Sequence, residues 1–141
     1  MWLLFALGSA FFAGITAILA KLGIHGHDST LVTALRTSVV FLGAWIVAAI
    51  SIKGRFASEL TTITPRTYLF LFLSGLATGA SWLCYYRALQ EGPASVVVPI
   101  DKLSILVTVA FSAFMLREHV SGRYLLGIAS MCAGAVLVVI G

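Results

Sequence analysis

Three charged side chains lie within long apolar stretches of the chain, and they are the first candidates for a functional site. Asp101 and Lys102 fall inside the run VVVPIDKLSILVTVAFSAFML over 96–116, and Arg36 falls inside TALRTSVVF. A charged side chain at the centre of a membrane-spanning helix costs roughly 2.5–3.5 kcal/mol. These residues therefore need a partner, a cavity or the membrane interface to face.

Ion recognition is the chemistry that these three side chains could perform. The two positive side chains, Arg36 and Lys102, outnumber the one negative side chain, Asp101. This surplus of one positive charge predicts an anionic or zwitterionic ligand. Asp101 is also a deep carboxylate that could carry a proton, as intramembrane carboxylates do in many pumps and carriers.

Catalysis has little support in the sequence. The chain contains no GxSxG or HExxH motif, no paired aspartates and no phosphate-binding glycine loop. His25 and His27 flank Gly26 without a third ligand, and His119 stands alone. We therefore expect no catalytic residue, no metal site and no cofactor, and we predict that the protein is not an enzyme.

The composition is that of a membrane protein. Hydrophobic residues make up 60% of the 141 residues and charged residues 10%, whereas a soluble domain is about half apolar and a quarter charged. The net charge of +4 comes from basic residues that separate apolar runs instead of forming one face, as membrane topology signals do. We expect the lipid bilayer as a partner and no nucleic acid.

Five stretches are long enough to cross a bilayer, which takes about 20 apolar residues per helix. Capping residues agree with them: Asp28, Ser29 and Thr30 offer caps for the second stretch, Thr64-Pro65 for the third and Ser121 for the fifth. The loop 53–64 has room for one interfacial turn at most. We predict an all-α integral membrane protein in which residues 1–141 form one domain of five transmembrane helices, at about 2–22, 30–52, 66–89, 95–116 and 123–140.

These helices would bring the charged residues to one depth. Consecutive helices alternate in direction, so Arg36 and Asp101 both lie about 9 Å below the same membrane face. Spacings of three and four residues place Ser104 and Thr108 on one stripe of the fourth helix with Asp101. A second polar stripe, on the third helix, includes Tyr85 and lies beside Trp82. We expect the substrate-binding cavity to be formed by Arg36, Trp82, Tyr85, Asp101, Lys102, Ser104 and Thr108.

Structural roles are the alternative for these residues. If Pro99 marks the start of the fourth helix, Asp101 falls in the first turn, where the helix dipole favours a carboxylate, and its lysine neighbour extends to the interface. Arg36 can pair with Asp101 for stability alone. Trp82, Tyr85 and Tyr86 can belong to an aromatic belt at the membrane surface. Serine and threonine hydroxyls can bond to the backbone one turn back.

Charge and glycine patterns predict orientation and assembly. Basic residues near the helix ends number five on the face of the N-terminus and two on the opposite face, or four if the deeper Arg36 and Lys102 are counted. Either count favours the N-terminus inside and the C-terminus outside, and the bias is slight with the deeper residues included. Gly127, Gly134 and Gly141 repeat every seven residues on the fifth helix, and small residues let helices approach closely in lipid. We expect Gly127 and Gly134 at an oligomer interface; packing within the bundle is the alternative.

Segments of the chain resemble a known transporter family. YYRALQEGPAS at 85–95, VVPIDKLSILVT at 97–108 and LREH at 116–119 are similar to segments of the EamA family in the drug/metabolite transporter superfamily. Arg36 matches the arginine that such domains place early in their second helix, and PIDKLS resembles the short five-helix bacterial and archaeal members. The resemblance covers essentially the whole chain.

The resemblance implies an inner-membrane carrier that moves a small polar metabolite by alternating access, with export favoured. Ten-helix relatives contain two five-helix units in inverted orientation, with the substrate between them. One such unit needs a second copy, so the resemblance implies a homodimer, antiparallel in the simplest case, or a second five-helix subunit. Two other functions stay open: a non-transporting subunit that packs on a larger partner, and a subunit that flips lipid-linked headgroups.

Overall fold

A computed structural model describes residues 1–52, 54–115, 117 and 121–141, and every regular element in these ranges is an α-helix. The helices are α1 (Trp2–Gly23), α2 (Ser29–Ile52), α3 (Phe56–Thr62), α4 (Pro65–Glu91), α5 (Ala94–Asp101), α6 (Ser104–Met115) and α7 (Gly122–Ile140). Five spans are long and apolar enough to cross a membrane, and α5 and α6 together form one of them. The predicted all-α fold with five transmembrane helices is confirmed.

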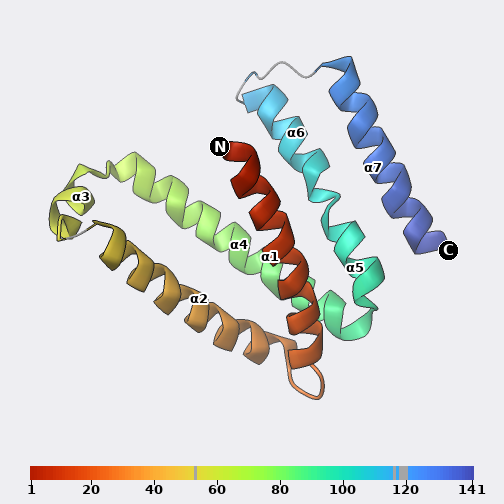
Figure 1. Ribbon diagram of the computed structural model, residues 1–141, viewed down its shortest axis with the longest axis horizontal. Coiled ribbons are helices and arrows are strands. Elements are labelled where there is room, and N and C mark those ends of the chain that lie inside the picture. The colour runs from red at the N-terminus through yellow and green to blue at the C-terminus, as the bar shows by residue number, and fades with distance from the viewer. Residues whose placement is uncertain (53, 116, 118–120) are drawn as a thin grey trace. The chain divides into compact units, whose positions relative to one another are not determined.

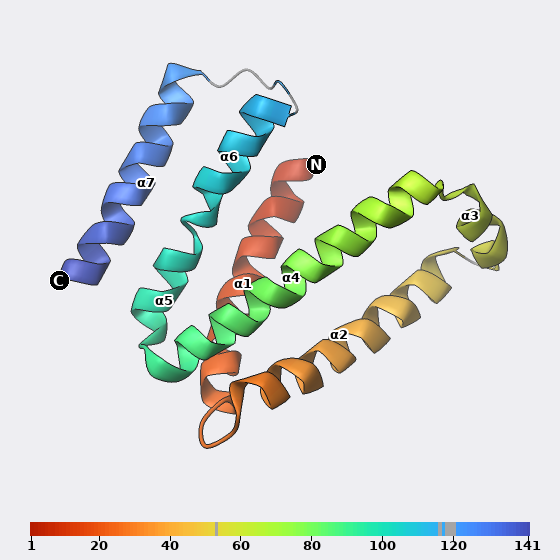
Figure 2. The same cartoon turned by 180° about the vertical axis from the view of Figure 1, so that it is seen from behind.

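The chain divides into two compact units. Unit 1 comprises Met1–Lys21 and Glu91–Gly141, and unit 2 comprises Leu22–Gln90. In unit 1, α5 packs against α7, whose Ile128 and Ala135 are seven residues apart and buried. In unit 2, α2 and α4 run side by side as a hairpin with α3 in the connection (Figures 1 and 2). The single domain expected from the sequence stays a prediction.

Three helices begin at the polar residues that the sequence predicted as caps. In each case a side-chain oxygen accepts a backbone N–H of the first turn, which would otherwise have no partner within the helix. The three bonds are Thr30 N to Asp28 Oδ1 at 2.8 Å, Thr67 N to Thr64 Oγ1 at 3.3 Å and Tyr124 N to Ser121 Oγ at 3.3 Å. The starts of α2, α4 and α7 are thus fixed by local hydrogen bonds.

The predicted fourth helix, 95–116, is interrupted between α5 and α6. Three N–H groups at this point bond to the carbonyl three residues back, where an α-helix uses the carbonyl four back. The bonds join Leu103 N to Ile100 O at 2.9 Å, Ile105 N to Lys102 O at 3.1 Å and Leu106 N to Leu103 O at 2.9 Å. The prediction of one continuous helix was wrong, because hydropathy averaged over a run does not register a change in hydrogen-bond pattern.

The loop 53–64 contains more structure than predicted. Within its described part, α3 has seven residues, about two helical turns, where the sequence predicted one turn at most. Hydroxyl groups support this short helix by donating to carbonyls three residues back. The bonds are Ser58 Oγ to Arg55 O at 2.8 Å, Thr61 Oγ1 to Ser58 O at 2.8 Å and Thr62 Oγ1 to Glu59 O at 2.7 Å.

Some sequence predictions concern residues outside the described part of the chain. Lys53 belongs to the charge count behind the predicted orientation. Leu116 is the predicted end of the fourth helix and, with Glu118 and His119, belongs to the LREH segment of the family resemblance. The structural predictions made for these positions therefore stay predictions.

Candidate functional site

Arg36 of α2 lies against two aromatic side chains of α4 in unit 2. Its guanidinium carbon, Cζ, is 4.4 Å from the centroid of the Trp82 ring and 5.7 Å from that of Tyr86. Trp82 and Tyr86 are four residues apart, so they share one face of α4. A guanidinium over an aromatic ring is attracted by the negative ring face, while its N–H groups still point outward in the guanidinium plane. The structure thus brings together two predicted site residues, Arg36 and Trp82.

Buried polar atoms without a partner accompany this contact. Arg36 Nη1, Tyr86 OH and Gln90 Oε1 are buried and make no hydrogen bond within the described part of the chain. Gln90 Nε2 donates to His27 O at 3.0 Å, and because only the amide NH₂ can donate, this bond identifies Oε1 as the unpartnered end. An unpaired buried polar atom costs about 1–3 kcal/mol. Three of them in one unit point to a bound ligand or to ordered water.

Tyr86 and Gln90 were not predicted as site residues. Tyr86 is only 2% exposed, which does not fit a lipid-facing aromatic belt. With Trp82 the two residues follow a spacing of four along α4, and this spacing was the signal in the sequence that could have identified them. The predicted Tyr85 lies beside Tyr86, with ring centroids 6.0 Å apart, and its role in the cavity stays a prediction.

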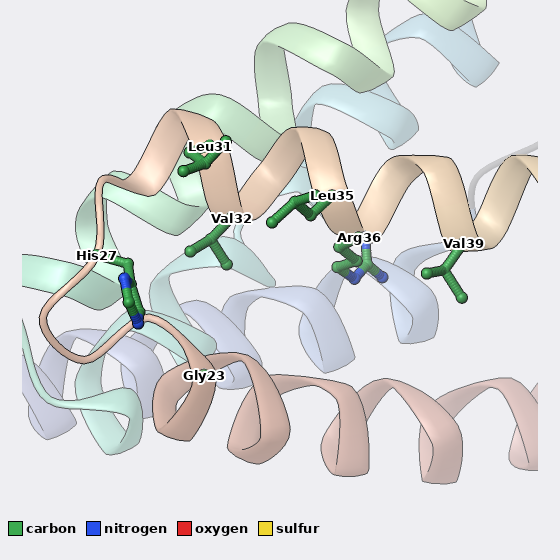
Figure 3. A pocket seen from close by; sticks show the side chains of 7 residues that line it. All are labelled: Gly23, His27, Leu31, Val32, Leu35, Arg36 and Val39. Carbon is green, nitrogen blue, oxygen red and sulfur yellow. The ribbon is translucent and has the colours of Figure 1, made fainter.

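A pocket with a volume of about 490 Å³ lies beside Arg36 in unit 2. Figure 3 shows His27 and Arg36 toward opposite ends of the lining, with Val32 and Leu35 between them. The lining consists of Gly23, His27, Leu31, Val32, Leu35, Arg36 and Val39. One permanent cation beside an aliphatic wall suits a ligand with an anionic group and a short apolar part.

Asp28 controls the electrostatics at the start of α2, in the loop before the membrane-spanning segment. The backbone N–H groups of Leu31 and Thr30 donate to its carboxylate and hold the pKa of Asp28 below its ordinary value of 3.8, with a smaller contribution from the charge of Arg87. The carboxylate therefore stays ionised at neutral pH and compensates the positive end of the α2 dipole. This helix start is occupied by the protein's own anion and is not open to a ligand.

Asp101 and Lys102 lie at the interruption between α5 and α6 in unit 1. Asp101 Oδ2 and Lys102 Nζ are 3.4 Å apart, and the side chains are 36% and 56% exposed, respectively. The interpretation that places Asp101 in a first helical turn was wrong, because α5 begins after its N-cap Pro93 and contains Pro99 in its interior. Asp101 is instead the last residue of α5, at the negative end of the helix dipole.

Ser104 and Thr108 are the two predicted site residues on α6. Thr108 Oγ1 donates to Ser104 O at 3.2 Å, which is the backbone bond considered as the alternative to a ligand contact. The hydroxyl oxygen of Thr108 can still accept a hydrogen bond. Because the interruption separates Asp101 from Ser104, one continuous helical stripe does not join them, and a ligand shared by these residues stays a prediction.

Arg36 and Asp101 occupy equivalent positions in different units. Each is the eighth residue of its helix, about 10 Å from the helix start. Arg36 belongs to unit 2 and Asp101 to unit 1. Their common depth and their pairing stay predictions.

Gly127 and Gly134 lie on α7 one residue before the buried Ile128 and Ala135. A Cβ atom built on either glycine would meet no atom within 4 Å, so packing inside the described chain does not require the absence of a side chain there. The role of these glycines in an oligomer interface stays a prediction.

Comparison with known proteins gives a family match over almost the whole chain. The profile of the EamA-like transporter family matches residues 1–140. A protein of Sinorhizobium sp named as an uncharacterized transporter in the cobO 3′ region is 43% identical over 139 residues, which cover 99% of this chain and 96% of that protein. No solved structure gives a significant match.

Proposed function

Because the chain belongs to the EamA-like transporter family and is thus a membrane transporter, we propose that it carries a small anionic or zwitterionic metabolite by alternating access. We expect the protein to lie in the inner membrane and to export its substrate. The binding site centres on Arg36 and Trp82, with Tyr86 and Gln90 completing it. Further cavity residues are those predicted from the sequence, Tyr85, Asp101, Lys102, Ser104 and Thr108.

The observation that carries this proposal is the environment of Arg36. Arginine stays protonated in proteins, and here its charge lies in a membrane-spanning helix with aromatic faces beside it. Its Nη1 has no hydrogen-bond partner among the described residues. A carboxylate or phosphate oxygen of a ligand would supply both the missing hydrogen bond and the compensating charge.

The pocket beside Arg36 limits the size and character of the ligand. Its volume of about 490 Å³ falls within the range of about 300–1,000 Å³ that is typical of small-molecule sites. The aliphatic side chains between His27 and Arg36 favour a short apolar part over a second charge. Small carboxylic acids and zwitterions with aliphatic side chains are the first compounds to test.

The expected assembly is a homodimer, antiparallel in the simplest case, or a pair with a second five-helix subunit. The described residues form five candidate spans, which is half the number in a ten-helix inverted-repeat carrier. Topology reporters fused to the C-terminus, one active only inside the cell and one only outside, test the arrangement. Signal from both supports the antiparallel homodimer. Signal from the outside reporter alone supports the charge-based orientation and requires an oppositely inserted partner or a parallel assembly.

Substitution of Arg36 tests the proposed function. Small carboxylic acids and zwitterions that bind should raise the midpoint of thermal unfolding of the purified protein. The compounds that raise it should also be transported in proteoliposomes. Arg36→Gln should weaken ligand binding more than about tenfold, because it removes a charged hydrogen bond worth roughly 1.5–3 kcal/mol. Arg36→Lys should recover only part of the affinity, since an ammonium lacks the planar guanidinium fork.

Arg66→Gln is the matched control, because Arg66 also lies over an aromatic ring, with its Cζ 5.8 Å from the centroid of Phe70, and does not line the pocket. Binding and transport should be unchanged in that variant. Equal anion binding by wild type and Arg36→Gln would contradict the proposal. Loss of activity in both arginine variants would show a general need for positive charge and would contradict it as well.

A further inference from the structure

The interruption between α5 and α6 exposes backbone carbonyls within a membrane-spanning segment. In a continuous helix, Pro99 O would accept the N–H of Leu103, and Asp101 O the N–H of Ile105. Here the N–H of Leu103 bonds to Ile100 O at 2.9 Å, and that of Ile105 bonds to Lys102 O at 3.1 Å. The carbonyls of Pro99 and Asp101 thus lose their helical donors. Backbone that departs from helix geometry at membrane depth needs a protein or cavity environment that satisfies it.

The electrostatics at this point favour a cation. Asp101 is the C-terminal residue of α5, where the helix dipole places partial negative charge, and its carboxylate adds a full negative charge. Ser104, the first residue of α6, contributes a hydroxyl oxygen to the same short segment. Carboxylate, carbonyl and hydroxyl oxygens are the donors that hard metal cations prefer.

The chain's own cation at this point is Lys102. Its Nζ lies 3.4 Å from Asp101 Oδ2, and its side chain is 56% exposed. A contact of this length and exposure is a weak ion pair, worth about 0.2–1 kcal/mol. The ammonium can therefore be displaced by a small metal ion that binds the carboxylate and the free carbonyls together.

We propose that the interruption between α5 and α6 is a binding site for a monovalent metal cation, with Asp101 and the carbonyls of Pro99 and Asp101 as ligands. One carboxylate among neutral oxygens suits a single positive charge, whereas Ca²⁺ sites in proteins usually gather several carboxylates. Interrupted helices bind coupling ions in this way in other carriers. The inference extends the proposed function by assigning its coupling ion, but cation binding itself does not depend on transport.

Equilibrium binding of radioactive Na⁺ to the purified full-length protein tests the site. The ionic strength is held constant with choline chloride. Wild type should bind Na⁺ saturably, and unlabelled NaCl should displace it. Asp101→Asn should raise the Kd more than about tenfold, since it removes a metal-binding charge and even residues that only support a ligand often cost tenfold or more. Asp28→Asn is the matched control, because Asp28 is a carboxylate that caps α2 outside the spans, and its Kd should equal that of wild type.

A second variant separates a binding defect from misfolding. Lys102→Met keeps the length of the side chain and removes the competing ammonium, so it should tighten Na⁺ binding about twofold to fivefold. A gain in affinity cannot come from an unfolded protein. Weaker binding in Lys102→Met, absence of saturable Na⁺ binding, or equal binding in Asp101→Asn would overturn the inference.

The Arg36 variants separate this inference from the proposed function. Arg36→Gln should bind Na⁺ as wild type does, because Arg36 is not one of the proposed cation ligands. If wild type binds anions through Arg36 but does not bind Na⁺, only the cation site is overturned. If Na⁺ binding is intact and substitution of Arg36 does not change anion binding, only the proposed substrate site is overturned.

Discussion

Arg36 keeps its charge inside α2 by lying on the rings of Trp82 and Tyr86, whereas Asp101 stands beside Lys102 where the backbone is interrupted. A cation over an aromatic face remains able to bind an anion. The charge of a carboxylate beside a lysine is already partly neutralised. Another cation can take the place of the lysine ammonium and neutralise the carboxylate in its turn. The two charges are therefore expected to serve different steps, Arg36 in ligand binding and Asp101 in coupling.

Replacement of Asp101 is the direct test of its role in transport. Asp101→Asn should lower the rate of uptake or efflux more than about tenfold with an unchanged protein level, because a neutral amide cannot exchange cations or protons. Transport in proteoliposomes, normalised to incorporated protein, provides the measurement. Asp28→Asn, a carboxylate change outside the spans, should transport normally. Full activity of Asp101→Asn would remove Asp101 from the mechanism.

The cap at Asp28 makes stability depend on pH. Its pKa is lowered in the folded protein by the N–H groups of Leu31 and Thr30, so the ionised form stabilises α2 above the ordinary value of 3.8 and this contribution is lost as the pH falls below it. Asn caps a helix about as well as Asp and has no charge to lose. The unfolding midpoint of wild type should therefore fall more steeply with acidification than that of Asp28→Asn. Parallel curves for the two proteins would contradict this assignment.

At the scale of helices, the sequence was most informative where a local hydrogen bond decides the structure. Asp28, Thr64 and Ser121 were predicted as caps, and each accepts a backbone N–H at the start of its helix. Runs of apolar residues identified all five spans, because crossing the hydrocarbon requires a helix of sufficient length. These features depend on neighbours in sequence, which a single chain displays directly.

The sequence was least informative where contacts between helices or a change in backbone pattern decide the structure. Tyr86 was identified as a site residue by its burial, and Gln90 by its hydrogen bond to His27 O. Neither property can be read from composition. The interruption after Asp101 occurs without a glycine or proline at 102 or 103. Neither residue at 102 or 103 predicts the interruption. It is visible only in which carbonyl each backbone N–H bonds to.

Loss of a cap should weaken α7 by a measurable amount. Ser121→Ala removes the acceptor of the Tyr124 N–H and should lower the free energy of unfolding by about 1 kcal/mol, measured by titration with denaturing detergent. Ser130→Ala is the control, since Ser130 Oγ donates to Leu126 O within the same helix and its loss leaves the backbone bonds intact. Equal stability of Ser121→Ala and wild type would contradict the role of the cap.

At the scale of the whole molecule, the proposed dimer can be tested at the glycines of α7. Gly127→Leu should reduce the dimer fraction in size-exclusion chromatography with light scattering, because a bulky side chain prevents close helix approach in the membrane. The fold should persist, since a Cβ at Gly127 meets no atom within 4 Å. Gly43→Leu, at an equally open position of α2, should leave the dimer intact. An unchanged dimer in Gly127→Leu would exclude this face from the interface.

The interruption between α5 and α6 also affects how the protein enters the membrane during synthesis. α5 has 8 residues and α6 has 12, so they extend about 12 Å and 18 Å, and neither alone crosses a hydrocarbon core of about 30 Å. The segment must insert as one piece while two of its carbonyls lack helical donors. Although its hydropathy is close to that of α7, we expect the isolated segment Ala94–Met115 to insert less efficiently than α7 in a glycosylation-mapping assay. Its membrane insertion would then depend on contacts with neighbouring helices.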